Sequence, residues 1–128
     1  MMSAPSFFAV SMILVAGTYR SGTNDDPAKI ATNMQAMNQA ALTLFRAGHL
    51  PIAGEALAMP LIEIAGSRRI GDAIFDEIFH PIAERVLRRC DACLRIGGAS
   101  KGVDEMVQIA EAMGQTVYRR IEDAPGCE

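Results

Sequence analysis

The stretch Met12-Ile-Leu-Val-Ala-Gly17 decides the fold of this chain. Its first five residues form a continuous apolar run, which is typical of a strand buried on both faces of a parallel sheet. Gly17 ends the run and opens a loop of small and polar residues. Further on, Asn24-Asp-Asp-Pro27 places an acidic cap before a proline, which predicts that a helix begins there. The opening of the chain is therefore predicted as strand, loop and helix.

Short apolar runs and amphipathic segments alternate along the rest of the chain. Further strands are predicted over His49 to Ala53, Asp91 to Ile96 and Thr116 to Ile121. Helical spacing of apolar residues predicts helices after Pro27, over Gly54 to Ala65, from Asp72 to Val86 and over Lys101 to Met113. Pro60 and Pro81 each remove a backbone donor and are expected to interrupt or kink their helices. The alternation predicts an α/β fold, a single-domain parallel sheet of four or five strands flanked by helices, similar to flavodoxin or Rossmann folds.

With 128 residues, half of them hydrophobic, the chain has the size of one domain. We assign the domain to residues 12–121, with a flexible extension over 1–11 and a C-terminal tail over 122–128. The apolar run from Phe7 to Ala16 lacks the preceding basic residues of a signal peptide and is too short to cross a bilayer. Translation could also start at Met12.

Composition narrows the class of partner. Twelve basic and 15 acidic residues are spread along the chain, which lacks the basic patch of a protein that binds a nucleic-acid polymer. Three cysteines, an odd number, favour a reduced cytoplasmic protein over a disulfide scaffold. Cys90-Asp-Ala-Cys93 lies between a predicted helix and a strand, the wrong end of a helix for a redox motif, and no other residues show zinc-ligand spacing. We therefore expect no membrane association, no metal and no cofactor.

Two glycine-rich loops are the candidate binding site. They are Gly17-Thr-Tyr-Arg-Ser-Gly22 and Gly97-Gly-Ala-Ser-Lys-Gly102, and each follows a predicted strand. Such loops direct backbone N–H groups and a helix N-terminus at an anion. Neither completes a P-loop or a dinucleotide fingerprint, so we expect a small phosphate or sugar rather than a nucleoside triphosphate. The candidate binding residues are Gly17, Thr18, Tyr19, Arg20, Ser21, Gly98, Ser100 and Gly102. Ordinary strand-to-helix turns remain the alternative.

Two sets of titratable residues are candidates for catalysis. Asp104 and Glu105 fall in the first turn of the helix after the second loop, where acids complement the helix dipole. A carboxylate there could instead attack a sugar carbon or stabilise a sugar cation. Asp76 and His80 lie four residues apart on one helix, which allows either an acid–base unit or an exposed ion pair.

At these residues the chain resembles the nucleoside 2-deoxyribosyltransferase superfamily, which includes 2'-deoxynucleoside 5'-phosphate N-hydrolases and uncharacterised bacterial domains. Residues 15–22 resemble its opening strand and loop, with Arg20 at the position of the hydrolases' loop arginine. Residues 90–92 and 100–103, with Ala110, Ala112 and Gly114, resemble its second signature. The similarity extends from Ile13 to Val117. It implies a five-stranded parallel sheet, an N-glycosidic bond as target, a nucleophilic carboxylate on the helix after the serine loop, and a homo-oligomer.

Two positions depart from the family pattern. Counting back from Ala110, Ala112 and Gly114 without a gap places Met106, not Glu105, at the family's nucleophile position. One residue along a helix is a rotation of about 100°, enough to turn the Glu105 carboxylate away from a sugar. Ala83 stands where the family tends to carry an aspartate, for which His80 or Glu84 could substitute. The candidate catalytic residues are thus Glu105, Asp76, His80 and Glu84.

Two functions follow from this interpretation. The first is an enzyme that cleaves or transfers a nucleoside or nucleotide at its N-glycosidic bond. The second is a nucleotide- or phosphate-binding module that has lost catalysis, so whether the chain is an enzyme stays open. A Glu105 side chain within reach of Tyr19 and Arg20 would favour the enzyme, and one directed at solvent or a neighbouring helix would favour the module. Methionines at positions 34, 37, 59 and 113 suggest adaptable surfaces, consistent with a homo-oligomer.

Overall fold

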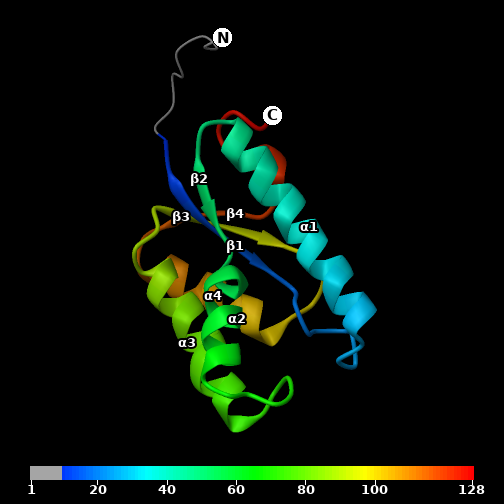
Figure 1. The fold of residues 1–128 in the computed structure, drawn as a ribbon. Coiled ribbons are helices and arrows are strands. Elements are labelled where there is room, and N and C mark those ends of the chain that lie inside the picture. Colours follow the sequence, from blue (N-terminus) through cyan, green and yellow to red (C-terminus); the bar gives the residue numbers. More distant parts are fainter. Residues whose placement is uncertain (1–9) are drawn as a thin grey trace.

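The structure, a computed structural model, describes residues 10–128 and has an α/β fold (Figure 1). Four parallel strands form one sheet in the order β2-β1-β3-β4. Their bounds are β1 Met12–Gly17, β2 Leu50–Ile52, β3 Ala92–Ile96 and β4 Thr116–Tyr118. This order is that of a flavodoxin-like sheet, and it confirms the predicted fold class. The expected N-terminal extension falls mainly on residues 1–9, outside the described residues.

Helices cover both faces of the sheet (Figure 1). Because strand side chains alternate between the faces, an unbroken apolar strand exposes apolar surface on both, and each face needs helices to bury it. They are α1 Pro27–Arg46, α2 Gly54–Ile64, α3 Ala73–Leu87 and α4 Lys101–Ala112. Ile13 and Val15 of β1 pack with α1, whereas Leu14 and Ala16 pack with α3 and α4. The first strand is therefore buried on both faces, as its unbroken apolar run predicts.

Helix starts follow their predicted caps. The Asp26 carboxylate accepts a hydrogen bond from the backbone N–H of Ala28, immediately after Pro27, so the cap predicted for α1 is confirmed. Ser100 caps α4 by accepting from the N–H of Val103 at 3.3 Å. The Ser100 cap places the second glycine-rich loop directly against the N-terminus of α4, whereas residues 23–26 separate the first loop from α1.

Neither proline interrupts its helix, so the interruption predicted at Pro60 is wrong, and of the two outcomes predicted at Pro81 the split does not occur. Pro60 lies inside α2 and Pro81 inside α3, and both helices are continuous. Each proline removes one backbone hydrogen bond, but the extensive packing of α2 against α3 around Ala58, Ile62 and Phe75 offsets that loss.

The C-terminal segment also differs from its expected form. Strand β4 ends at Tyr118, and Ile121–Asp123 forms a short 3-10 helix, η1, so within residues 10–128 the sheet lacks the fifth strand that the resemblance implied. Ala124 is fully buried in the core, and the carbonyl of Pro125 lies 2.7 Å from Nε2 of His49. Nδ1 of His49 accepts from the N–H of Ser11, so Nε2 carries the proton and donates to Pro125. The segment is thus part of the folded domain.

Within the described part of the chain, no helix is both long and apolar enough to cross a membrane.

Candidate functional site

A pocket opens where the two glycine-rich loops leave the sheet. Gly17 at the end of β1 pairs with Ile96 at the end of β3, so both loops start side by side at the carboxyl edge. This edge is where open α/β sheets bind ligands. The cavity measures about 150 Å³, about ten times the space needed for one water molecule. Its lining comprises Leu14, Val15, Ala16, Gly17, Tyr19, Arg20, Ser21, Gly54, Glu55, Phe79, His80, Ala83, Ser100, Gly102, Val103 and Met106.

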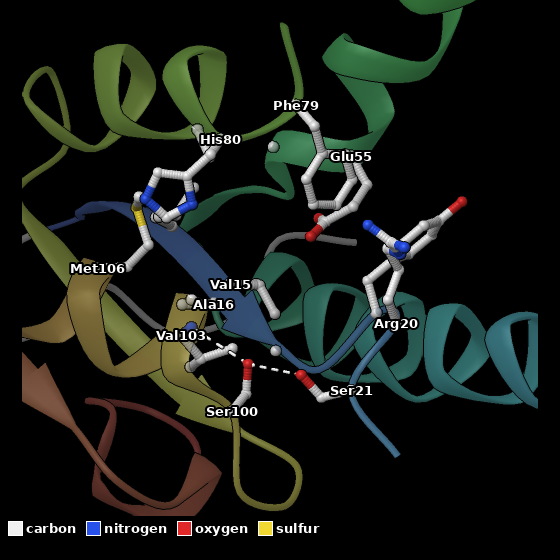
Figure 2. A pocket seen from close by; sticks show the side chains of 16 residues that line it. Val15, Ala16, Arg20, Ser21, Glu55, Phe79, His80, Ser100, Val103 and Met106 are labelled. Atoms are coloured by element: carbon white, nitrogen blue, oxygen red, sulfur yellow. Dashed lines mark hydrogen bonds between the residues drawn. The ribbon is translucent and has the colours of Figure 1, made fainter. Parts of the chain in front are cut away.

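Two serines join the loops at the floor of the pocket (Figure 2). Ser21 Oγ donates to Ser100 Oγ at 2.9 Å, and Ser100 Oγ also accepts from the N–H of Val103. With two bonds accepted, the Ser100 hydroxyl hydrogen is left to donate to a ligand at the N-terminus of α4. Of the predicted binding residues, only Thr18 and Gly98 lie outside the lining.

Arg95 shapes the second loop, a role that sequence reasoning did not assign. Its guanidinium donates to the carbonyls of Gly97 and Gly98, at 3.1 and 3.0 Å, and pairs with Asp104 at 3.1 Å. Asp104 therefore has a structural partner on β3, and it is absent from the pocket lining. Arg95 fixes the path of the loop that carries Ser100.

Arg20 lies at the pocket and is held in place by a carboxylate. Its Nε and Nη2 donate to Asp25 at 2.9 and 3.1 Å, and its Cζ lies 5.5 Å from the centre of the Phe75 ring. The hydrogen bond that Arg20 donates to Asp25 raises the pKa of Arg20, and the charge of Asp76 contributes in the same direction. Asp76 itself does not line the pocket.

Tyr19 supports the aromatic wall of the pocket. Its ring lies 5.2 Å from that of Phe79, and its hydroxyl lies 3.6 Å from the Sδ of Met59. Burial raises the pKa of Tyr19, and the nearby charge of Glu55 raises it further. The phenol therefore stays protonated at neutral pH and contributes a donor and an aromatic face.

Glu55 is the carboxyl group inside the pocket, and sequence reasoning missed it. It is the second residue of α2, and Figure 2 shows its carboxyl group on the same side of the pocket as the Arg20 guanidinium. Its Oε2 is buried and has no hydrogen-bond partner among the described residues. Burial raises its pKa to about 7. The sequence does contain a signal, because Glu55 is the only charged residue between His49 and Glu63 and follows directly on a predicted strand.

His80 and Glu105 form a pair at the rim (Figure 2 shows His80 beside Met106). Nε2 of His80 lies 3.4 Å from Oε2 of Glu105, and the two side chains are 38 % and 46 % exposed. His80 lines the pocket, whereas on α4 Met106 rather than Glu105 does so. Glu105 thus contacts α3, which is the placement that favours the binding module.

The remaining predicted positions lie as follows. Glu84 pairs with Arg88 at 2.9 Å along α3 and lies outside the lining. Ala83, where the resembled family tends to carry an aspartate, lines the pocket and packs against the backbone of Gly54. None of the acidic residues predicted from the sequence, Asp76, Glu84 and Glu105, therefore lines the pocket.

Metal and thiol chemistry gain no support from residues 10–128. No group of three or more His, Cys, Asp or Glu side chains in that range is arranged to hold a metal ion. Cys90 and Cys93 are buried, and burial raises the pKa of Cys90 to about 11 and that of Cys93 to about 12. Both thiols are therefore protonated and unreactive at neutral pH.

No protein-family model matches this chain, and no curated protein sequence gives a significant match to it.

Proposed function

We propose that the pocket binds a nucleoside or nucleoside monophosphate and cleaves or transfers it at its N-glycosidic bond, with Glu55 as the reacting carboxyl group. The observation that carries this proposal is the Glu55 carboxyl in the pocket, whose buried Oε2 has no hydrogen-bond partner among residues 10–128. A buried polar group without a partner costs free energy, so a ligand that satisfies it gains affinity. A donor or acceptor on the ligand would supply the missing partner.

The pKa of about 7 suits Glu55 to proton transfer at neutral pH. As the C1'–N bond of the nucleoside breaks, its electron pair leaves with the base, and the protonated Glu55 gives the base a proton. The carboxylate that remains stabilises the positive sugar and then takes a proton from water or from an incoming base, whose oxygen or nitrogen bonds to C1'. The first acceptor gives hydrolysis and the second gives transfer.

Other pocket residues provide ligand contacts for the same proposal. Arg20 offers charge-assisted donors to a 5'-phosphate, and Ser100 offers its hydroxyl beside a helix N-terminus. Phe79 offers an apolar surface to a base. Glu105 pairs with His80 outside the pocket lining and has no direct part in this scheme, unlike the nucleophile that the resemblance implied.

The second candidate is a binding module without catalysis, favoured by the pairing of Glu105 with His80 outside the pocket lining. A panel of nucleosides and nucleoside 5'-monophosphates, followed by chromatography of the free base, separates the two. Base release by the wild type supports the enzyme. Saturable binding of a panel member without base release supports the module, and binding of no panel member contradicts both.

We also propose that the protein is cytoplasmic and forms a homo-oligomer. Leu57, Leu61 and Ile64 expose apolar surface along α2, with Ile64 87 % exposed. Burying such side chains against a second copy would stabilise an oligomer. Sedimentation velocity at micromolar concentration tests this, and a monomer would contradict it.

A further inference from the structure

Arg20 is held by three residues from two segments, and we call this arrangement the arginine clasp. Asp25 binds one edge of the guanidinium through two hydrogen bonds, of 2.9 and 3.1 Å. Phe75 lies beneath it at 5.5 Å, and Gly71 lies against its terminal nitrogens. Asp25 belongs to the loop after β1, whereas Gly71 and Phe75 border the start of α3.

The backbone of the first loop is bent so that Asp25 reaches Arg20. Asn24 and Asp25 have φ angles of 51° and 58°, in the left-handed region that, apart from glycine, asparagine and aspartate adopt most readily. Thr23 is 2 % exposed, and its hydroxyl donates to the Arg20 carbonyl and accepts from the Asp25 N–H. The turn, held by Thr23, therefore orients the Asp25 carboxylate toward Arg20.

The clasp leaves part of the guanidinium unused. Arginine has five N–H donors, and Asp25 takes one on Nε and one on Nη2. The donors on Nη1 and the second donor on Nη2 have no partner among residues 10–128. These donors match the oxygens of a phosphate, which arginine binds through two parallel hydrogen bonds.

Gly71 keeps space free beside those nitrogens. A Cβ at position 71 would lie 2.8 Å from Nη2 and 3.1 Å from Nη1 of Arg20. Any side chain there would displace the guanidinium or occupy the space beside its unused donors. The backbone at Gly71 also has a φ of 84°, which glycine adopts without strain.

We propose that Asp25 and Gly71 are positioning residues that present Arg20 to a 5'-phosphate, so that the clasp makes the pocket prefer a nucleoside monophosphate to the unphosphorylated nucleoside. The choice of ligand rests on the proposed function. The opposite role for Asp25 would be that of an internal anion that competes with the phosphate for Arg20. The two roles predict opposite effects of removing its charge.

The first experiment compares Asp25→Asn with Asp26→Asn. Asparagine tolerates the left-handed backbone at position 25, and at position 26 it still caps α1, so both variants lose one charge and keep their local structure. Calorimetry with a deoxynucleoside 5'-monophosphate and with the matching deoxynucleoside measures the preference. We expect Asp25→Asn to bind the monophosphate about tenfold more weakly, with deoxynucleoside affinity unchanged and Asp26→Asn like the wild type. Unchanged or tighter monophosphate binding by Asp25→Asn overturns the proposal.

A second measurement needs no nucleotide. NMR of the Arg20 Nε–H reports its hydrogen bond to Asp25, and addition of inorganic phosphate reports the unused donors. We expect a slowly exchanging Nε–H that phosphate perturbs in the wild type, and fast exchange with a weakened phosphate response in Asp25→Asn and in Gly71→Ala. If these NMR results are obtained but no nucleotide binds, the positioning role of Asp25 and Gly71 is supported and the proposed function fails. If phosphate leaves Arg20 of the wild type unperturbed, the clasp proposal fails.

Discussion

Gly54 and Ala83 meet so closely that a Cβ at position 54 would lie 2.8 Å from the Cβ of Ala83. This contact brings the N-terminus of α2 against the middle of α3 and so places Glu55 inside the pocket. It also gives a physical reason for the small residue at position 83, because a larger side chain there would collide with the start of α2. Position 83, where the resembled family tends to carry an aspartate, and Glu55 in the pocket thus lie at the same contact between α2 and α3.

Gly54→Ala should therefore destabilise the protein, although alanine normally favours a helix over glycine. Overpacking against Ala83 is expected to lower the free energy of unfolding by about 1–3 kcal/mol. Gly98→Ala is the matched control, because no atom of the described part of the chain lies within 4 Å of a Cβ at that position. Urea denaturation of both variants measures the difference, and a Gly54→Ala variant as stable as the wild type would refute the contact.

Glu55 should make stability depend on pH. Its pKa in the folded state is about 7, against an ordinary value of 4.5, so the folded protein binds this proton more tightly than the unfolded chain. The stabilisation that this tighter proton binding gives the folded state is fully present below pH 4.5. It is lost as the pH rises through about 7, which lowers the free energy of unfolding by up to about 3 kcal/mol. Glu55→Gln should remove this dependence.

Chemical denaturation of wild type and Glu55→Gln between pH 5 and pH 8 tests that prediction. Glu63→Gln, an exposed change on the same helix, serves as the control and should track the wild type. A wild type and a Glu55→Gln variant that respond identically to pH would show that the carboxyl titrates normally.

Ser100 should matter more for stability than Ser21. Ser100→Ala loses the cap of α4 and the link between the loops, for an expected cost of about 1 kcal/mol. Ser21→Ala loses only the link, which is exposed, and should stay within a few tenths of a kcal/mol of the wild type. Thermal unfolding of the two variants tests whether Ser100→Ala has the lower melting temperature. Equal melting temperatures would contradict the prediction.

Arg20→Ala should weaken binding of a nucleoside monophosphate about tenfold to a hundredfold while leaving stability nearly unchanged. Its ion pair with Asp25 is partly exposed, at 36 % and 46 %, and such pairs contribute little to folding. Calorimetry with the ligand and thermal unfolding without it test the two halves separately. A large loss of stability would identify Arg20 as a structural residue.

The fold was predictable because its signals are local. The apolar run at residues 12–16, the Asp26–Pro27 start and the two loops each determine the element next to them, and the parallel sheet follows from their alternation. The interruption predicted at Pro60 is wrong because tertiary packing overrides the loss of one backbone hydrogen bond. The short end of β4 and the folded segment after it depend on contacts with Ala124 and His49 that are distant in sequence.

The site was predictable only in part. The loops supplied Arg20, Ser21 and Ser100, which do line one pocket. The resemblance implied a carboxylate on this helix and so drew attention to Glu105, although ungapped spacing selects Met106, which does line the pocket. Glu55 enters the pocket through helix packing that no spacing rule encodes. A single charge in an apolar stretch was the available signal for Glu55, and it points to burial rather than to a particular partner.

The most direct test of the account is the rate of free-base release from the nucleoside monophosphate that the wild type turns over fastest, measured from pH 5 to pH 9 for the wild type, Glu55→Gln and Glu105→Gln. General acid–base catalysis typically contributes about 10²- to 10⁴-fold, so Glu55→Gln should lose a factor of that size. The wild-type rate should fall as the pH rises through about 7, where Glu55 loses its proton. Glu105→Gln should retain most of its activity, because Glu105 contacts His80 rather than the pocket. Full activity in Glu55→Gln together with its loss in Glu105→Gln would contradict the account.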